Sequence, residues 1–364
     1  MWCSTLDRFM INLIDMFKVF LLLTCLAVTF FCEGSVTTYR VSSVKELKEA
    51  VHQINLLPTS LPVEVILADG DYENATNIRI THANTKLRSQ SNDPEKVLLS
   101  GSGMQNAPYV EVIFDISASN VTVSGMTLKN VANHLIQVRA ERDADFFTLT
   151  NCILQDSYQQ LLKVSAANEH FADFGIIKNN RFEYTAGVGP SYYIGGIDAH
   201  RARGWTVADN TFINIASPAE RVAEYAIHFW NKSGNVRITD NTIINSDRGI
   251  GLGMGNNGDV IGENEVINNR IVHTNKEHLF ADVGISLESV SDTLVIDNII
   301  YMTTSYPNAI EYRFPNTQNN IIMNNVTNRA IVSRDNGAAL LSNNKQATTG
   351  DRLWLQFKHY FNQL

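Results

Sequence analysis

Apolar and polar residues alternate along most of this chain in short segments rich in β-branched residues. Clear examples are Trp-Thr-Val-Ala-Asp-Asn at 205–210 and Val-Arg-Ile-Thr-Asp-Asn at 236–241. Successive side chains of a strand point to opposite faces, so this alternation predicts short strands with one face in a core. The segments carry no sustained helical periodicity, which disfavours helical repeats.

A different pattern near the start of the chain predicts a helix. Val44, Leu47 and Val51 share one helical face, and Ser43 stands three residues before Glu46 as a capping pair. We expect this helix to cover the open end of the strands that begin after it.

A short motif recurs at a nearly constant spacing through the rest of the sequence. It is an asparagine, usually preceded by Asn or Asp, that is followed two places later by Ile or Phe. Successive copies are 26 to 31 residues apart, which indicates a repeat architecture. The motif positions are Asn151, Asn180, Asn210, Asn241, Asn269 and Asn298. Asn325 continues the series with a degenerate Asn-Val-Thr, and Gly125 occupies the same place one repeat earlier.

Short strands with this period predict an all-β, right-handed parallel β-helix with three strands per coil. Coils stack about 4.8 Å apart, so an asparagine at one turn can hydrogen-bond to the asparagine of the next coil. Asparagine also tolerates left-handed backbone angles. The repeated asparagines are therefore expected to hold turns rather than to carry chemistry.

The chain divides into four expected regions. Residues 1–34 contain an apolar run of thirteen residues that is short for a membrane span and typical of a signal peptide, with 1–15 as an upstream start extension. Residues 35–96 form the cap and first coils, 97–345 the β-helix, and 346–364 an aromatic-rich cap or tail. The alternatives to a cleaved signal peptide are an uncleaved membrane anchor and a lipoprotein.

Cysteine content and charge narrow the class of protein. Cys3, Cys25 and Cys32 lie in the signal region, which leaves Cys152 alone and excludes an internal disulfide or a cysteine metal site in the mature chain. The net charge of −8 is spread along the chain and disfavours a nucleic-acid partner. We expect a secreted or periplasmic monomer with no membrane insertion after cleavage.

The opening of the mature chain resembles a known family. Val-Ser-Ser-Val-Lys-Glu-Leu, Leu-Ala-Asp-Gly-Asp-Tyr and Val-Ser-Gly-Met-Thr-Leu-Lys-Asn, within residues 40–130, are similar to the start of alginate and chondroitin lyases. The wider resemblance is to bacterial β-helix proteins of the polysaccharide lyase and pectate lyase type, which implies an acidic polysaccharide as substrate. Asn231-Lys232-Ser233 is similar to the segment with the catalytic lysine of those lyases, which makes Lys232 a candidate binding residue. The arginine of that pattern falls at Gly253, so the resemblance implies no complete lyase mechanism.

Three similar segments mark the candidate site. They are GIDAHR at 196–201, AIHFWN at 226–231 and GIGLGM at 249–254. If the isoleucines face the core, the alternate positions face outward. The outward residues on these and the two following coils are Asp198, His200, His228, Trp230, Gly251, Gly253, Ser286, Glu288, Glu311 and Arg313.

We expect these residues to line a groove. Gly251 and Gly253 would leave the backbone accessible to a sugar ring, and Trp230 would stack against that ring. Asp247 and Arg248 would lie at the edge of the groove. For β-elimination on a uronate polymer, Arg248 or Arg313 would neutralise the carboxylate while His228 or His200 removes the C5 proton.

Two other functions remain open at this point. Glu288 and Glu311 lie one coil apart diagonally, about 7–8 Å, which suits an inverting glycoside hydrolase. A β-helix can also bind glycans without catalysis. Asp198 is expected to orient a histidine or to help hold Ca²⁺ with Glu288, although no cofactor is required.

Overall fold

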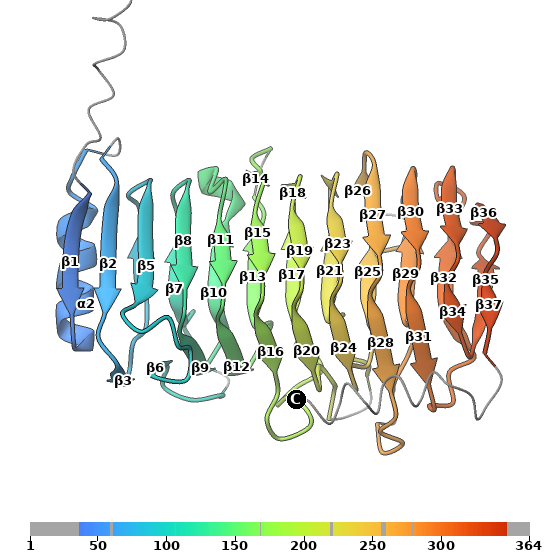
Figure 1. The fold of residues 1–364 in the computed structure, drawn as a ribbon, viewed down its shortest axis with the longest axis horizontal. Coiled ribbons are helices and arrows are strands. Elements are labelled where there is room, and N and C mark those ends of the chain that lie inside the picture. The colour runs from blue at the N-terminus through green and yellow to red at the C-terminus, as the bar shows by residue number, and fades with distance from the viewer. Residues whose placement is uncertain are drawn as a thin grey trace, which may run out of the picture. The chain divides into compact units, whose positions relative to one another are not determined.

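The structure is a computed structural model, and it describes residues 36–58, 61–105, 107–167, 169–218, 221–255, 260–278 and 280–347. Residues 37–347 wind as a right-handed parallel β-helix, as predicted, in which every strand pairs in parallel with the same strand of the next coil (Figure 1). The signal region and residues 348–364 of the expected tail lie outside the described residues. Among the described residues, no helix has the length and apolar character needed to cross a membrane.

The twelve-stranded sheet is long and faces solvent with mostly polar residues. Its strands, in spatial order, are β1 (Thr37–Val41), β2 (Val63–Leu67), β5 (Thr85–Ser89), β8 (Val121–Ser124), β11 (Thr148–Thr150), β15 (Ile176–Lys178), β19 (Thr206–Ala208), β23 (Arg237–Thr239), β27 (Asn264–Ile267), β30 (Thr293–Ile296), β33 (Asn320–Met323) and β36 (Ala339–Ser342).

An eleven-stranded sheet forms the second wall. Its strands are β3 (Gly70–Tyr72), β6 (Val97–Ser100), β9 (Thr127–Val131), β12 (Ile153–Ser157), β16 (Arg181–Glu183), β20 (Thr211–Ile213), β24 (Thr242–Ile244), β28 (Arg270–His273), β31 (Ile299–Met302), β34 (Val326–Thr327) and β37 (Lys345–Gln346).

A ten-stranded sheet forms the third wall and carries the candidate site. Its strands are β4 (Ile78–Ile80), β7 (Val112–Ile116), β10 (His134–Arg139), β13 (Leu162–Ser165), β17 (Ile197–His200), β21 (Ile227–Trp230), β25 (Ile250–Leu252), β29 (Ile285–Glu288), β32 (Asn308–Arg313) and β35 (Ala330–Arg334). A short four-stranded sheet joins some coils between the ten-stranded and twelve-stranded sheets, with strands β14 (Ala172–Asp173), β18 (Ala202–Arg203), β22 (Ser233–Gly234) and β26 (Val260–Ile261), and a 3₁₀ turn η1 spans Ala140–Arg142.

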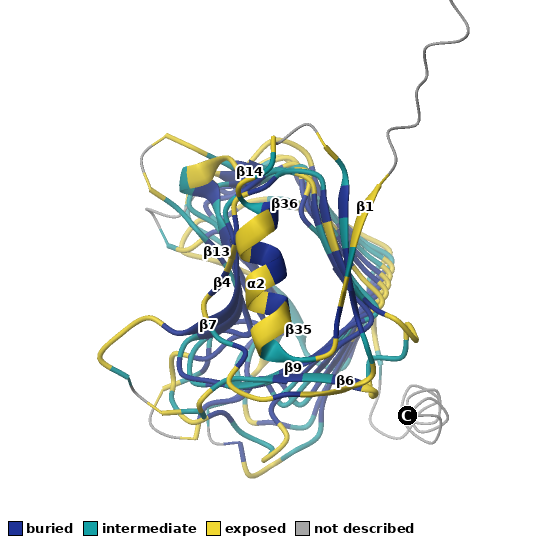
Figure 2. Cartoon of the chain, turned by 90° about the vertical axis from the view of Figure 1, so that its left-hand side faces the viewer, coloured by how far each residue is buried: buried dark blue, intermediate teal, exposed yellow. Residues whose placement is uncertain are grey.

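The expected helix is α2 (Val44–Ile54), and it caps the first coil. The Ser43 side chain accepts a hydrogen bond from the Glu46 amide at 3.2 Å, which satisfies one of the free donors of the first turn. Leu47, Val51 and Ile54 are buried. Viewed along the coils, α2 lies across the interior between the sheets, where it shields the otherwise open end of the core (Figure 2).

A column of buried asparagines runs through the turns between the twelve-stranded and eleven-stranded sheets. Each amide nitrogen donates to the side-chain oxygen of the asparagine one coil further at 2.9–3.0 Å. The same oxygen accepts the backbone N–H of the preceding asparagine, so every polar atom of these buried side chains is satisfied. The buried members are Asn180, Asn210, Asn241, Asn269, Asn298 and Asn325, and the half-buried Asn344 ends the column.

The beginning of this column differs from the prediction by one residue. Cys152, not Asn151, occupies the position next to Asn180, because the Cys152 amide donates to the Asn180 side chain at 2.9 Å. Asn151 stands one residue earlier in a left-handed turn, with φ of 52°, as Asn179 does with φ of 58°. The sequence motif did not distinguish these two positions because asparagine suits both.

We predict that Asn241→Ala lowers the free energy of unfolding by about 3 kcal/mol, measured by urea denaturation. The substitution leaves the buried Asn210 amide and the Thr239 and Val207 carbonyls without their side-chain partners. As a control, Asn268→Gly changes an exposed neighbour of the column that has a φ of 55° and keeps that backbone conformation accessible. Equal losses for the two variants would contradict the role of the column.

Candidate functional site

The outward side chains of the ten-stranded sheet fall into two rows, as the alternation predicts. Parallel pairing places Lys163, Asp198 and His228 at one level on adjacent coils, and then Gly251, Ser286 and Glu311. A second row contains Arg139 beside Ser165, His200 beside Trp230, and Glu288 beside Arg313. The inward residues Ile197, Ile227 and Ile250 are fully buried, which confirms the expected register.

Lys163 is the centre of the most compact group of polar residues on this face. Its ammonium donates to the Asp198 carboxylate and lies 2.9 Å from His200 Nε2. The indole N–H of Trp230 donates to the other Asp198 oxygen at 2.7 Å. We call Lys163, Asp198, His200 and Trp230 the Lys163 cluster.

The electrostatics of the Lys163 cluster fix its protonation states. Burial would raise the pKa of Asp198, but the adjacent positive charge of Lys163 outweighs it and holds that pKa far below its usual range. Burial lowers the pKa of His200 more than Asp198 raises it. At neutral pH the aspartate is therefore ionised and the imidazole neutral.

The tautomer of His200 follows from its neighbours. Nε2 faces the Lys163 ammonium, which can only donate, so Nε2 carries the lone pair and Nδ1 carries the proton. Nδ1 lies 3.1 Å from the Asn231 side-chain amide, whose oxygen can accept this proton once the amide is oriented accordingly. With 16% of its side chain exposed, His200 is accessible from the outer face.

His228 is held inside the site rather than at its surface. Only 1% of its side chain is exposed, and Nε2 donates to the Gly253 carbonyl at 3.0 Å. Nδ1 faces the carboxylates of Glu224 at 3.5 Å and Asp198 at 4.0 Å. The ring also stacks parallel to Trp230, with centroids 5.6 Å apart. This geometry lets His228 position Trp230 and Asp198, whereas a polymer has no direct path to its nitrogen.

A second group surrounds Arg248 at the other end of the strands. Its Nε donates to Asp282 at 3.2 Å, and its guanidinium lies 5.1 Å from the Tyr225 ring centroid. Burial raises the pKa of Asp282. Burial would also raise the pKa of Glu224, but the contact with His228 outweighs it and lowers that pKa.

The prediction that Gly251 and Gly253 leave an open surface for a sugar ring is wrong. A Cβ placed on Gly251 would lie 2.6 Å from Cε2 of Tyr225, so the tyrosine ring already covers this glycine. Gly253 has a φ of 80°, a left-handed angle that glycine adopts without strain, and presents its carbonyl to His228. The two glycines make room for protein groups, not for a sugar.

The expected pair of Glu288 and Glu311 is committed to other contacts. Glu311 is buried and accepts hydrogen bonds from Tyr306, Asn308 and Arg334. Glu288 accepts from the Gly255 amide at 2.7 Å and from Arg313 at 3.1 Å. Both carboxylates are one coil apart as predicted, but neither is free to exchange protons with a bound sugar.

The remaining expected residues lie away from the Lys163 cluster. Lys232 pairs with Glu169 at 3.5 Å in the turn after β21. Asp247 is buried and accepts the backbone amides of Ser217 and Ala223, so it does not form an exposed rim. Arg313 bridges Glu288 and Asp335.

The Ca²⁺ expected between Asp198 and Glu288 does not fit these contacts. Each carboxylate already has a cationic partner, Lys163 for Asp198 and Arg313 for Glu288. The two residues also stand three coils apart, or about 14 Å by strand spacing. A single ion cannot bridge that distance with bonds of about 2.3–2.6 Å.

The two long turns before β17 and β21 contact each other beside the site. The Arg221 guanidinium lies 4.2 Å from the Tyr192 ring centroid, and Tyr192 and Tyr193 are exposed. These exposed rings lie at the end of the strands opposite to Trp230, where they could stack against sugar rings.

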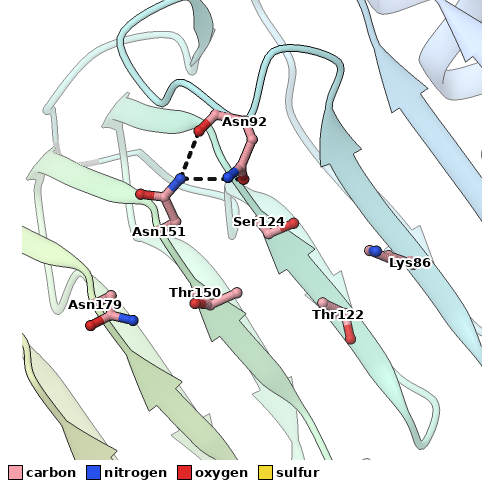
Figure 3. A pocket seen from close by; sticks show the side chains of 7 residues that line it. All are labelled: Lys86, Asn92, Thr122, Ser124, Thr150, Asn151 and Asn179. Carbon is pink, nitrogen blue, oxygen red and sulfur yellow. Dashed lines mark hydrogen bonds between the residues drawn. The ribbon is translucent and has the colours of Figure 1, made fainter.

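A polar hollow lies on the twelve-stranded sheet instead. It has a volume of about 730 Å³ and is lined by Lys86, Asn92, Thr122, Ser124, Thr150, Asn151 and Asn179 (Figure 3). Asn151 donates to the Asn92 backbone at 2.7 Å. Its lining has one cation and otherwise only amides and hydroxyls, so it lacks the acid–base groups that the ten-stranded sheet supplies.

Several residues of this site were not recognised in the sequence. Lys163 was not assigned a role, although it lies beside Asp198 on the preceding coil in the same alternating register. Glu224, Tyr225 and Asp282 come from turns, whose paths the repeat does not fix.

The chain is thus a right-handed parallel β-helix protein that carries a cluster of ionisable side chains on its ten-stranded sheet. A family described as "Right handed beta helix region" matches residues 195–350. A comparison of the sequence with curated proteins found no match.

Solved structures share the fold at low sequence identity. The surface adhesin PfbA of Streptococcus pneumoniae aligns with a TM-score of 0.57 and 13% identity over 84% of this chain and 91% of its own. DFA-IIIase from Arthrobacter chlorophenolicus A6 aligns with 0.52 and 13% over 89% of both chains. An alginate lyase from Paenibacillus aligns with 0.50 and 12% over 85% of this chain and 99% of its own. These likenesses establish the fold.

We predict that stability falls between pH 6.5 and 4 partly because of His134, which is buried beside the site and contacts the Gln160 carbonyl at 3.0 Å. Burial and the positive charge of Lys163 lower the pKa of His134 to about 4. The unfolded chain takes up this proton first, near pH 6.5, so the stabilisation is complete above that pH and lost as the pH falls to 4. His134→Gln should make the loss of unfolding free energy between pH 7 and 4 smaller by roughly 2–3 kcal/mol. An unchanged pH dependence in urea denaturation would contradict a neutral buried His134.

Proposed function

We propose that this protein is an exported carbohydrate-active β-helix protein that cleaves an acidic, uronate-containing polysaccharide by β-elimination. The observation that supports this most strongly is the neutral His200 imidazole 2.9 Å from the Lys163 ammonium on the outer face. A base beside a cation is what the reaction requires, because the C5 proton becomes acidic only when the adjacent carboxylate is neutralised.

Lys163 takes the role first expected of Arg248 or Arg313. Arg248 lies two coils from His200 and at the opposite end of the strands, on the order of 15 Å along the strand direction. A uronate's carboxylate and C5 proton are separated by only two bonds, so Arg248 and His200 cannot serve the same sugar. Lys163 and His200 can.

Substrate binding would free the base. The Lys163 ammonium has three protons, of which one goes to Asp198 and one to His200. A uronate carboxylate that captures this ammonium releases the lone pair of His200 Nε2. His200 then removes the C5 proton, a C4–C5 double bond forms as the C4–oxygen bond breaks, and the imidazolium returns the proton to the departing oxygen.

The other members of the Lys163 cluster position these two groups. Asp198 accepts a hydrogen bond from the Lys163 ammonium and fixes the Trp230 ring by accepting one from the indole N–H. Trp230 lies against His200, with ring centroids 4.2 Å apart, so a sugar stacked on the indole would bring its C5 near Nε2. His228 supports the indole from behind.

We predict that His200→Ala lowers the rate of unsaturated-product formation on polyuronates by about 10²–10⁴-fold, the usual contribution of a general base. The rate is followed by ultraviolet absorbance of the new double bond. His170→Ala is the matched control, because His170 is exposed and pairs with Asp143, outside the Lys163 cluster.

The substrate screen should include several polyuronates and sulfated glycans. Full activity in His200→Ala would refute its role as the base. Binding of these glycans without any product would instead favour the non-catalytic reading, in which Trp230 is only a stacking surface.

A second candidate function, glycoside hydrolysis with inversion, is favoured by the carboxylates on either side of Arg248. Burial raises the pKa of Asp282, whereas the contact with His228 lowers that of Glu224 despite its burial. Hydrolysis needs one carboxyl with a raised pKa as the acid and one with a lowered pKa as the base. Their coils are two apart, or about 10 Å between backbones, which allows the about 6.5–9.5 Å separation of inverting enzymes.

If hydrolysis is the reaction, Asp282→Asn and Glu224→Gln should each abolish the release of reducing ends while no absorbance forms. Wild-type activity should then fall as the pH rises through the raised pKa of Asp282 and fall as it drops through the lowered pKa of Glu224. Reducing-end assays across pH on the wild type and both variants test this. Activity that survives both substitutions would exclude this pair.

A further inference from the structure

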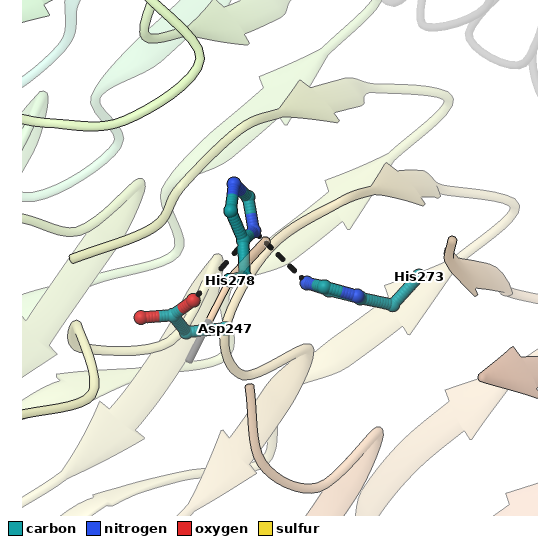
Figure 4. Close-up of side chains that lie close together, drawn as sticks. All are labelled: Asp247, His273 and His278. Atoms are coloured by element: carbon teal, nitrogen blue, oxygen red, sulfur yellow. Dashed lines mark hydrogen bonds and ion pairs between the residues drawn. The ribbon is translucent and has the colours of Figure 1, made fainter. Parts of the chain in front are cut away.

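Three buried side chains that do not belong to the Lys163 cluster meet at one corner of the β-helix. Asp247 lies in the turn between β24 and β25, His273 ends β28, and His278 lies in the connection from β28 to β29. They come from two adjacent coils where the eleven-stranded and ten-stranded sheets join. All three are buried, and they point toward one another (Figure 4).

The donor atoms of these side chains converge. His273 Nε2 lies 3.1 Å from His278 Nδ1, and His278 Nδ1 lies 3.9 Å from Asp247 Oδ1. All three atoms fall within 4.8 Å of one another. Tetrahedral bonds of about 2.0–2.1 Å place ligand atoms about 3.3 Å apart, so the two nitrogens already have this spacing and the carboxylate needs only a small approach.

The carboxylate of Asp247 is satisfied on one side only. Oδ2 accepts the amides of Ser217 at 2.8 Å and Ala223 at 3.0 Å. Oδ1, which faces His278, has no hydrogen-bond partner within the described part of the chain. A buried, unpaired carboxylate oxygen costs free energy unless a cation or donor meets it.

The two imidazoles turn nitrogen atoms toward the same point. His273 Nε2 and His278 Nδ1 can form either one shared hydrogen bond or offer two lone pairs to a metal ion. The unpaired Asp247 oxygen beside them favours the second arrangement.

We propose that Asp247, His273 and His278 form a divalent transition-metal site, with Zn²⁺ as the ion that this donor set suits. Two imidazoles and one carboxylate favour zinc over Ca²⁺ or Mg²⁺, which prefer oxygen donors alone. Three protein ligands leave a fourth position for water.

The position of the site indicates a structural role. Through Oδ2, Asp247 also holds the Ser217 and Ala223 amides of the preceding coil, just before Glu224. The Asp247 carbonyl accepts the Asp282 amide of the following coil at 2.6 Å. An ion here would tie three successive coils together. This structural role does not depend on which reaction the outer face of the ten-stranded sheet performs.

The test is metal content of the tag-free chain. The protein is stripped with a chelator, given one equivalent of Zn²⁺, passed over a desalting column and analysed by mass spectrometry for zinc. We expect about one zinc per chain for the wild type and at least a tenfold loss of affinity in Asp247→Asn and His278→Gln. His170→Gln, which removes an exposed histidine, should retain the ion.

A Co²⁺ titration of the wild type covers the case in which a variant fails to fold. Visible d–d absorption that saturates at one equivalent and is displaced by Zn²⁺ supports the site, as does a melting temperature that rises with Zn²⁺ in the wild type only. Wild-type protein that retains no zinc and develops no Co²⁺ band overturns the proposal in favour of a plain His273–His278 hydrogen bond. Equal zinc retention in folded Asp247→Asn and His278→Gln overturns it as well.

Discussion

The hydrogen bonds from one asparagine amide to the next fix the register of every coil from Asn180 to Asn344. Each amide sits in a dry turn, where an unpaired N–H or oxygen would cost more than the net gain of a hydrogen bond. A coil that slipped by one residue would break its bonds to both neighbours. The last coil, in which Asn344 follows Asn325 by only 19 positions, still keeps its place in the column.

This register is what brings charged residues together on the ten-stranded sheet. Lys163, Asp198 and His228 lie 30 or more residues apart in the chain, yet pairing sets them on adjacent strands about 4.8 Å apart. The Lys163–Asp198 pair is almost fully buried, and removing one partner of such a pair leaves a charge that the interior cannot solvate. Fixed strands thus hold an arrangement that would not assemble on a flexible surface.

The sequence was sufficient for the repeat, the capping helix, the strand alternation and the rows of outward residues, because all of these follow from periodicity and burial. It was insufficient wherever a turn residue reaches over a strand. Tyr225 covers Gly251, and no periodic argument places that ring, because it comes from a long turn without a repeat. For the same reason, the partners that commit Glu311, such as Tyr306, and the convergence of Asp247 with His278 could not be anticipated.

The proposed location of the site rests on the claim that sugars bind across the Lys163 cluster and not in the polar hollow around Lys86. A crystal structure of the His200→Ala variant with an oligouronate tests this directly. The account predicts a sugar ring stacked on Trp230 with its carboxylate on Lys163 Nζ. An oligosaccharide bound instead along the twelve-stranded sheet near Lys86, with the Lys163–Asp198 pair undisturbed, would contradict it.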